Sequence, residues 1–334
     1  MLIDARAWGN KRGIGQITEE VLRPLLVRLR WAKSTVLTYD SQCAMIAGAA
    51  GAQAILLPSG VVGKLIDRVS WLTGVPTVPG TFDVTIALAG RPVPARGRKC
   101  IGILYDAGPL LLPELHTALD RLYMAATLRQ ARRWVCVITL TRAAAAELLG
   151  LDGMLNITNV WYPGVMVAEC HDSAWESRNC VVCTAGLSPK KNGQRVVDAI
   201  AVLARRDPIW RKRLVMLGPE SFVAREQFWR LLCQARVLVA PSLHEGFGLS
   251  VIEGLMAGCN VVASDIPPHR EIGGPALAYF DPNSTTDLAG ALQRAWCTAP
   301  GSYDAPLDWS VERAVRELYE IVAAHASLQG GGDS

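Results

Sequence analysis

The sequence lacks the features that would place it in a membrane or secretory class. Its 334 residues contain no uninterrupted apolar run of about 18 residues, so no membrane-spanning helix is predicted. The N-terminus MLIDARAWG has no apolar signal core, because Asp4 and Arg6 interrupt it. No internal repeat or low-complexity tract occurs outside the tail QGGGDS, and we expect residues 328–334 to be disordered. We therefore expect a soluble globular protein of the cytoplasm, with about two domains.

The cysteines do not form a recognisable metal or redox motif. There are nine of them, and Cys180 and Cys183 make one Cys-x-x-C pair with no second pair at metal-ligand spacing. Because this pair lies in the apolar run CVVCTAG, a buried strand is favoured over zinc binding or redox chemistry. We expect free buried thiols in a reducing compartment, and no bound metal.

Charge is distributed unevenly along the chain. Residues 1–165 carry 18 Lys and Arg against 11 Asp and Glu, a net charge of +7, whereas residues 166–334 carry 16 against 19, a net charge of −3. A solvated surface, an acidic membrane or lipid phosphate, and nucleic acid could each explain the basic half. A solvated surface is the default, and Trp31 and Trp134 beside basic stretches support the membrane alternative. Nucleic acid is disfavoured because no aromatic-basic recognition motif is visible. The basic stretches contain Arg23, Arg28, Arg30, Lys33, Arg91, Arg96, Arg98, Lys99, Arg129, Arg132 and Arg133.

The most informative stretch is residues 236–267, RVLVAPSLHEGFGLSVIEGLMAGCNVVASDIP. It begins with an apolar run that ends at Pro241, which predicts a buried strand of a parallel sheet. Gly246 and Gly248 then permit a tight turn, and apolar residues recur at helical spacing from Leu249 onward. A helix is therefore predicted to begin near Gly248, and its first amide groups would stabilise an anion such as a phosphate.

Two carboxylates lie eight residues apart in the same stretch, at Glu245 and Glu253. Glu245 falls in the predicted loop and Glu253 falls more than one turn into the predicted helix. Each could accept hydrogen bonds from a different part of one extended ligand, and sugar hydroxyls suit that role. The alternative is that both are solvated carboxylates around an ordinary helix.

The segments EGFGLSVIE and PPHREIGGPALAYFDP resemble a known family. The first is similar to the motif of two glutamates separated by seven residues in the retaining family 4 glycosyltransferases of GT-B fold, and the resemblance extends over most of the chain. It implies that Glu245 contacts the donor sugar and that Glu253 contacts the ribose of the nucleotide. It assigns the sugar and the distal phosphate to a donor-binding loop that contains Gly246, Phe247, Gly248 and Leu249.

Two segments of the first half share this resemblance. The loop GNKRGIGQ, with Gly13 and Gly15, precedes a long helical pattern, and by resemblance it faces the donor diphosphate across the cleft. In ILYDAGPLLLPE, Tyr105 stands where relatives usually have a histidine near the sugar and the leaving group. A phenol can donate a hydrogen bond but does not change protonation near neutrality. Asp106 is assigned to orienting this loop or approaching the acceptor, and a structural role for both residues is the alternative.

The segment LSPKKNGQ resembles the phosphate-binding segment of the second domain. Lys191 would reach the donor diphosphate, and a lysine at a helix N-terminus is unfavourable unless an anion is present. Gly186 stands where relatives usually carry an arginine, and Lys190 is the residue that would compensate. A solvated surface lysine is the alternative for Lys191.

Alternating strands and helices in two halves predict an α/β protein with two doubly wound Rossmann-like domains facing a central cleft, and the resemblance implies that these domains have the GT-B architecture. We expect an acceptor-side domain in residues 1–165 and a nucleotide-sugar domain in residues 166–308, joined by the polar linker VAECHDSAWESRN. A last helix in residues 309–327 would cross back to the first domain. The second domain looks shortened by the strand and helix that usually help to hold the nucleobase.

The resemblance implies a metal-independent enzyme without a cofactor. It would transfer a hexose, mannose or glucose, from a nucleotide diphosphate sugar to a hydroxyl of a glycan or lipid-linked acceptor, at the inner face of the membrane in the lipid-linked case. Lys191, Lys190 and the amides near Gly248 would stabilise the departing diphosphate while Glu245 orients the sugar. The alternatives are a catalytically impaired homologue that acts as a partner subunit, favoured by Gly186 and Tyr105, and an epimerase or phosphorylase on the same fold.

Overall fold

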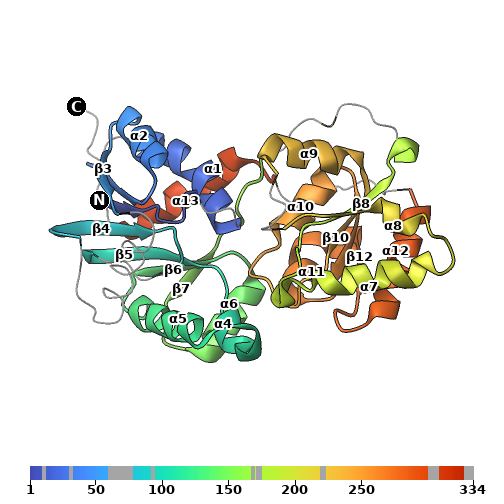
Figure 1. The fold of residues 1–334 in the computed structure, drawn as a ribbon. Coiled ribbons are helices and arrows are strands. Elements are labelled where there is room, and N and C mark those ends of the chain that lie inside the picture. The colour runs from blue at the N-terminus through green and yellow to red at the C-terminus, as the bar shows by residue number, and fades with distance from the viewer. Residues whose placement is uncertain are drawn as a thin grey trace. The chain divides into compact units, whose positions relative to one another are not determined.

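The structure is a computed structural model that describes residues 1–9, 13–29, 33–58, 78–91, 95–166, 170, 175–218, 223–299 and 308–326. The tail expected to be disordered, most of the predicted polar linker, and Arg30 and Trp31 lie outside the described residues. The chain divides into two compact units. One consists of Met1–Gly164 together with Asp308–Ser334, and the other consists of Val165–Leu307 (Figure 1). No helix in the described ranges is long and apolar enough to cross a membrane.

The first unit is built on a parallel sheet whose described strands follow the order β3-β2-β1-β4-β5-β6-β7. The chain adds β2 and β3 on one side of β1 and then returns to add β4 on the other side. Sheets of this kind bind ligands outside the carboxyl ends of the strands where this reversal occurs, here β1 and β4. The strands are β1 (Leu2–Asp4), β2 (Thr35–Thr38), β3 (Gln53–Leu56), β4 (Thr81–Ala87), β5 (Arg96–Leu104), β6 (Cys136–Thr139) and β7 (Ile157–Val160).

Helices connect these strands and bury their apolar sides against the sheet. Thr117 and Asp120 form a capping box that begins α5. The prediction of a loop around Gly13 and Gly15 was wrong, since both residues belong to the first turn of α1. The helices are α1 (Gly13–Arg28), α2 (Ser41–Ala49), α4 (Gly108–Leu111), η1 (Pro113–Leu115), α5 (Ala118–Ala131), α6 (Arg142–Leu151) and α13 (Val311–Ala326).

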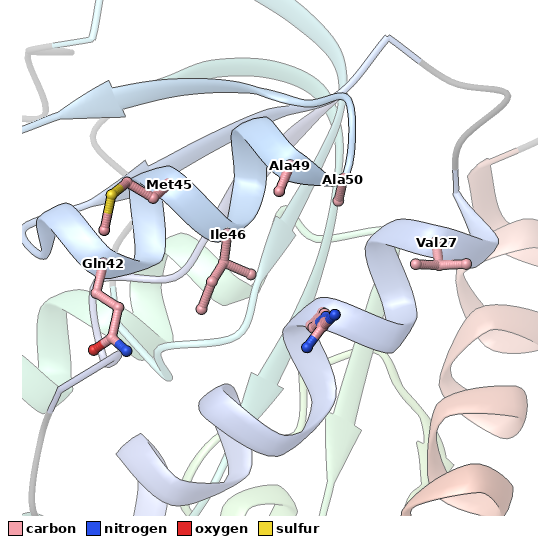
Figure 2. Close-up of a pocket in the computed structure, with 7 residues that line it drawn as sticks. Val27, Gln42, Met45, Ile46, Ala49 and Ala50 are labelled. Atoms are coloured by element: carbon pink, nitrogen blue, oxygen red, sulfur yellow. The ribbon is translucent and has the colours of Figure 1, made fainter.

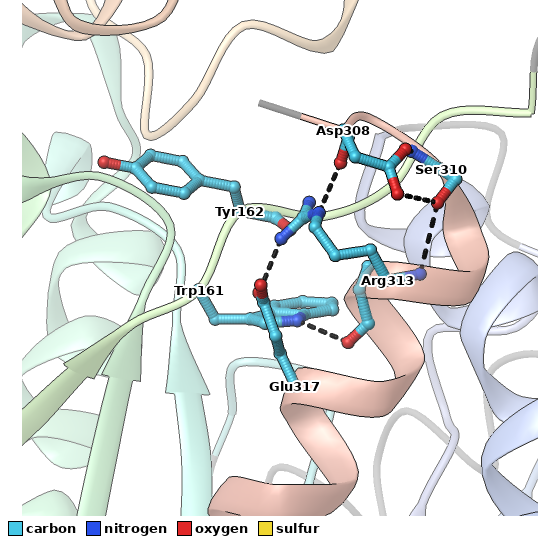
Figure 3. A network of polar contacts seen from close by, with 7 residues as sticks. Trp161, Tyr162, Asp308, Ser310, Arg313 and Glu317 are labelled. Carbon is cyan, nitrogen blue, oxygen red and sulfur yellow. Dashed lines mark hydrogen bonds and ion pairs between the residues drawn. The ribbon is translucent and has the colours of Figure 1, made fainter. Parts of the chain in front are cut away.

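The last helix, α13, is anchored to the segment that follows β7. Trp161 Nε1 donates to the carbonyl of Ala314 at 2.8 Å, and Arg313 Nη2 donates to the carbonyl of Tyr162 at 2.8 Å. Figure 3 shows the Arg313 guanidinium between this segment and its own helix, where it also pairs with Glu317 at 2.5 Å. These contacts make α13 part of the first unit, although it is the last described element of the chain.

The second unit is built on a smaller parallel sheet, whose described strands follow the order β12-β11-β10-β8-β9. The chain reverses its direction of growth between β8 and β10, so these two strands define the expected ligand-binding edge. The prediction of two doubly wound α/β units is confirmed. The strands are β8 (Cys180–Cys183), β9 (Leu214–Met216), β10 (Ala235–Ala240), β11 (Asn260–Ser264) and β12 (Leu277–Phe280).

The helices of the second unit pack on this sheet around an apolar core that includes Val181, Val239 and Phe280. Between β9 and β10, the described residues form a single helix, α9. The helical elements are η2 (Trp175–Ser177), η3 (Pro189–Lys191), α7 (Gly193–Ala204), α8 (Trp210–Arg213), α9 (Arg225–Gln234), α10 (Leu249–Met256), α11 (Pro267–Gly273), η5 (Gly274–Ala276) and α12 (Thr285–Cys297).

The prediction that the cysteines are free thiols is wrong for two of them. Cys170 and Cys233 form a disulfide, with Cα atoms 5.3 Å apart, that ties the start of the second unit to α9. The other seven are free, and Cys180 and Cys183 are strand residues of β8. Burial raises the pKa of the Cys183 thiol to about 12, which makes it a poor nucleophile at neutral pH. No cluster of metal-ligating side chains occurs in the part of the chain that the structure describes.

Candidate active site

The loops that follow β8 and β10 meet at the carboxyl edge of the second sheet. Lys191, at the end of η3, places its ammonium 2.5 Å from Glu245 Oε1, in the loop between β10 and α10. The Lys191 side chain is 40% exposed and the Glu245 side chain is 18% exposed. The structure thus brings together two residues that the sequence assigned to the same ligand. They lie where the strand order predicts a binding site.

Hydrogen bonds to backbone carbonyls hold these two loops against each other. The amide of Leu243 donates to the carbonyl of Lys190 at 3.0 Å. Asn192 Nδ2 donates to the carbonyl of Pro241 at 3.1 Å and to that of Pro282 at 2.9 Å. Asn192 adopts φ +58°, a left-handed conformation that asparagine tolerates better than most residues. The position of Lys191 is therefore fixed by the loop backbone on both sides of it.

Three glycines pack against one another below this loop. A Cβ on Gly193 would lie 1.6 Å from the carbonyl oxygen of Gly186, and a Cβ on Gly218 would lie 2.7 Å from the Gly186 Cα. Gly186 itself has φ +56°, which favours glycine over any residue with a side chain. A side chain at position 186 would therefore strain this backbone.

Glu245 is held as a carboxylate. Burial alone would raise its pKa, but the Lys191 ammonium and the hydrogen bonds from Lys191 and Ser242 outweigh burial and lower the pKa to about 2. Ser242 Oγ donates to Glu245 Oε1 at 2.6 Å. At neutral pH this side chain accepts hydrogen bonds and supplies negative charge, and it has no proton to give as an acid.

The helix predicted near Gly248 begins there, with Gly248 as the N-cap of α10 at φ +108°. A Cβ at Gly248 would lie 3.0 Å from His269 Cδ2, so glycine allows the helix start to pack against this ring. His269 is buried, and its Nδ1 lies 3.0 Å from the carbonyl of Ser264, an acceptor, which assigns the ring proton to Nδ1. Burial lowers the pKa of His269. The sequence analysis did not single out His269 and missed this contact.

Glu253 lies in α10 and is only 4% exposed. Its Oε1 pairs with Arg225 Nη1 of α9 at 2.5 Å. The sequence analysis did not single out Arg225, because nothing in its local pattern connects it to a residue 28 positions further along the chain.

Tyr105 and Asp106, two of the site residues predicted in the first unit, make contacts within that unit. The Tyr105 hydroxyl donates to the carbonyl of Leu88 at 2.7 Å, its ring packs against Gly90, and burial raises its pKa. Asp106 Oδ1 accepts from the amide of Gly108 at 2.8 Å, at the start of α4. Both side chains therefore support the local fold of the first unit.

A buried ion pair at the carboxyl end of β1 was also missed by the sequence analysis. Arg6 Nε and Nη2 each donate to the Asp4 carboxylate at 2.7 Å, and both side chains are almost fully buried. The sequence alone showed these charges only as an interruption of an apolar N-terminus. The structure shows that they form an ion pair with two hydrogen bonds. This pair lies at the end of β1, where the chain reverses the direction in which it adds strands to the first sheet.

A surface groove of about 460 Å³ lies between α1 and α2 of the first unit. Figure 2 shows Ile46 of α2 pointing toward α1. Most of its lining residues are apolar, and two of them, Val27 and Met45, are 54% and 68% exposed. It contains none of the predicted site residues. Its lining residues are Arg23, Val27, Gln42, Met45, Ile46, Ala49 and Ala50.

The fold places the chain among proteins of GT-B architecture. HepE of Anabaena, solved in complex with UDP-glucose, superimposes with a TM-score of 0.67 at 16% identity, over 97% of this chain and 99% of that one. WaaG, a glycosyltransferase involved in lipopolysaccharide biosynthesis, superimposes with a TM-score of 0.60 at 15% identity, over 99% of this chain and 100% of that one. At these identities the likeness shows the fold alone.

Sequence comparisons also find glycosyltransferases. Residues 220–296 match the family described as Glycosyl transferases group 1. The O-antigen chain mannosyltransferase B of Escherichia coli is 39% identical over 240 residues, which cover 60% of this chain and 62% of that protein. The serotype-specific mannosyltransferase WbdA of Escherichia coli is 22% identical over 59% of this chain and 29% of its own length. The chain thus spans less than two thirds of each of these relatives.

Proposed function

We propose that the protein is a retaining glycosyltransferase that moves a hexose, with mannose as the first candidate, from a nucleotide diphosphate sugar to a hydroxyl. The observation that carries this proposal is the Lys191–Glu245 pair beside the N-terminus of α10. An ammonium, a carboxylate and the N-terminal amides of a helix at one sheet edge suit a ligand that joins a diphosphate to a sugar. Mannose is supported by the names of the relatives, several of which are mannosyltransferases.

The proposed roles divide between the charged groups. Lys191, helped by Lys190 and by the amides of Phe247, Gly248 and Leu249, stabilises the diphosphate as its bond to the sugar breaks. Glu245 accepts hydrogen bonds from the sugar hydroxyls, which its ionised state favours. The new glycosidic bond forms on the face from which the diphosphate leaves, and the departing phosphate takes the proton of the acceptor hydroxyl.

The proposed acceptor is a glycan or a lipid-linked sugar, in polysaccharide or glycoconjugate biosynthesis. One relative is named a GDP-mannose:cellobiosyl-diphosphopolyprenol α-mannosyltransferase, from Xanthomonas oryzae pv. oryzae, at 31% identity over 22% of this chain and 26% of that protein. The excess of Lys and Arg in residues 1–165 supports contact with an anionic membrane surface that carries such an acceptor. Co-sedimentation with vesicles that contain anionic lipid should therefore exceed that with neutral vesicles and fall with added salt.

The proposal is tested by incubating the protein with GDP-mannose, GDP-glucose and the corresponding UDP-sugars, with and without bacterial lipid-linked glycans. We expect release of nucleoside diphosphate that depends on one donor and on acceptor, and a product with the anomeric configuration of the donor. Binding of donor without any release, for every donor and acceptor, would contradict an enzyme and favour the impaired partner subunit. Conversion of the donor without added acceptor would instead indicate an epimerase or phosphorylase.

A further inference from the structure

The ion pair between Arg225 and Glu253 joins two helices of the second unit at a buried position. Arg225 is the first residue of α9, and Glu253 lies one turn and a half into α10. The side chain of Glu253 is 5% exposed and that of Arg225 is 33% exposed, with 2.5 Å between Nη1 and Oε1. A buried carboxylate is costly unless a cation compensates it, and Arg225 provides that compensation.

The charge of Arg225 is unfavourable at its position in the first turn of its own helix. The first turn of a helix carries partial positive charge, which disfavours a cation there and favours an acidic residue such as Glu226. An arginine at this place is therefore explained by the group that it contacts across the fold, Glu253.

Other contacts fix the direction of the Arg225 guanidinium. It lies 5.4 Å from the ring centre of Phe228 and 5.2 Å from that of Trp229, which follow it at helical spacing on α9. Trp229 is buried. Nη2 also approaches the carbonyl of Met166 at 3.4 Å. Arg225 is thus held toward Glu253 by aromatic rings on one side and by the backbone on another.

We propose that Arg225 is a positioning residue for nucleotide recognition: it holds the Glu253 carboxylate in the orientation that accepts hydrogen bonds from ribose hydroxyls. This inference rests on the proposed function, in which Glu253 meets the ribose. A carboxylate has two oxygens with about four acceptor sites, so the bond to Arg225 is compatible with bonds from a ribose. A site built to bind a hydroxyl rejects an analogue that lacks it, so Arg225 sets the preference for ribose over deoxyribose through Glu253.

The experiment measures binding of GDP and UDP, and of the 2′-deoxy and 3′-deoxy forms of each, by isothermal titration calorimetry. The wild-type protein should bind one ribonucleotide at least about tenfold more tightly than one of its deoxy forms, because a charge-assisted hydrogen bond is lost. Arg225→Gln and Glu253→Gln should each remove most of this preference. The double variant should lose no more than either single variant, because both substitutions act on the same contact.

Arg230→Gln is the matched control on the same helix. Arg230 pairs with Glu226 at the surface, where both side chains are more than 70% exposed, at 74% and 78%. This variant should keep the wild-type preference for ribose. If Arg225→Gln does not fold, Arg225→Lys replaces it, and it should lower the preference at least about threefold because an ammonium does not reproduce the guanidinium fork.

The outcomes separate this inference from the proposed function. A folded Arg225 variant with the full wild-type preference, or additive losses in the double variant, would overturn the positioning role while leaving the proposed transferase intact. A wild-type protein that binds neither GDP nor UDP would overturn the proposed function, and the role of Arg225 with it.

Discussion

Gly193, the first residue of α7, approaches the carbonyl oxygen of Gly186 so closely that a Cβ would lie 1.6 Å from that oxygen. This contact joins the segment after β8 to the start of the helix that follows Lys191. Any side chain at position 193 must push the two segments apart, and the loop that carries Lys191 lies between them.

We therefore expect Gly193→Ala to destabilise the protein by about 1 to 3 kcal/mol, the usual cost of overpacking, and to weaken nucleoside diphosphate binding. Thermal unfolding and calorimetric titration measure the two effects. Gly150→Ala is the control, because a Cβ at Gly150 would meet no described residue within 4 Å apart from its own helix. Equal effects of the two substitutions would show that the close contact at Gly193 is relaxed at little cost.

Glu245→Gln should greatly reduce sugar transfer and leave nucleoside diphosphate affinity nearly unchanged. The amide keeps the shape of the side chain but loses the charge that strengthens bonds to sugar hydroxyls. Donor turnover and nucleoside diphosphate binding are measured on the same preparation. Near-normal turnover would rule out the proposed sugar contact.

Lys191→Ala should weaken nucleoside diphosphate binding by about 1 to 3 kcal/mol, the contribution of a charge-assisted hydrogen bond. Binding of the unphosphorylated nucleoside should change far less, because it has no group for Lys191 to contact. Titration with both ligands tests this difference. Equal affinity of the variant and the wild type for the diphosphate would remove Lys191 from the site.

Acid should destabilise the wild-type protein partly through Glu245. Despite its burial, Lys191 and Ser242 lower the pKa of this carboxyl from the ordinary value of 4.5 to about 2 in the folded state. The folded state therefore binds this proton less readily than the unfolded chain does. The resulting stability, on the order of 2 to 3 kcal/mol, is complete above the unfolded pKa and is lost as the pH falls toward the folded pKa.

Urea unfolding at a series of pH values between about 6 and 2.5 measures this loss. The wild-type protein should lose more unfolding free energy over this range than Glu245→Gln, whose amide does not titrate. Parallel losses in the two proteins would show that Glu245 does not contribute to acid sensitivity.

The sequence predicted the parts of the site that depend on neighbours along the chain. A strand, a glycine turn and a helix at Gly248 follow from local patterns, and α10 begins there. Partners brought in by the fold left no local signal, so Arg225 and His269 were missed. The helix α2, SQCAMIAGA, was also missed, because without charged residues it shows no contrast between its faces.

The direction in which a side chain points could not be predicted from the sequence either. Tyr105 follows the end of β5, where a site residue is plausible, yet its hydroxyl bonds to the carbonyl of Leu88 within its own unit. Periodicity identifies the buried face of a strand, but beyond the strand end it no longer determines which way a residue points. The two cysteines of the disulfide are 63 residues apart, and no local pattern in the sequence indicates that they pair.

The anchoring of α13 has a practical consequence for dissecting the molecule. In connectivity, the second unit is an insertion within the first, since residues of the first unit precede and follow it in the chain. A fragment that stops at Gly164 would leave Trp161 without the carbonyl of Ala314, its buried acceptor. Gly164 and Val311 are already in close contact. The first unit is therefore better isolated by excising residues 165–307 and joining Gly164 to Asp308 through a short linker than by truncation.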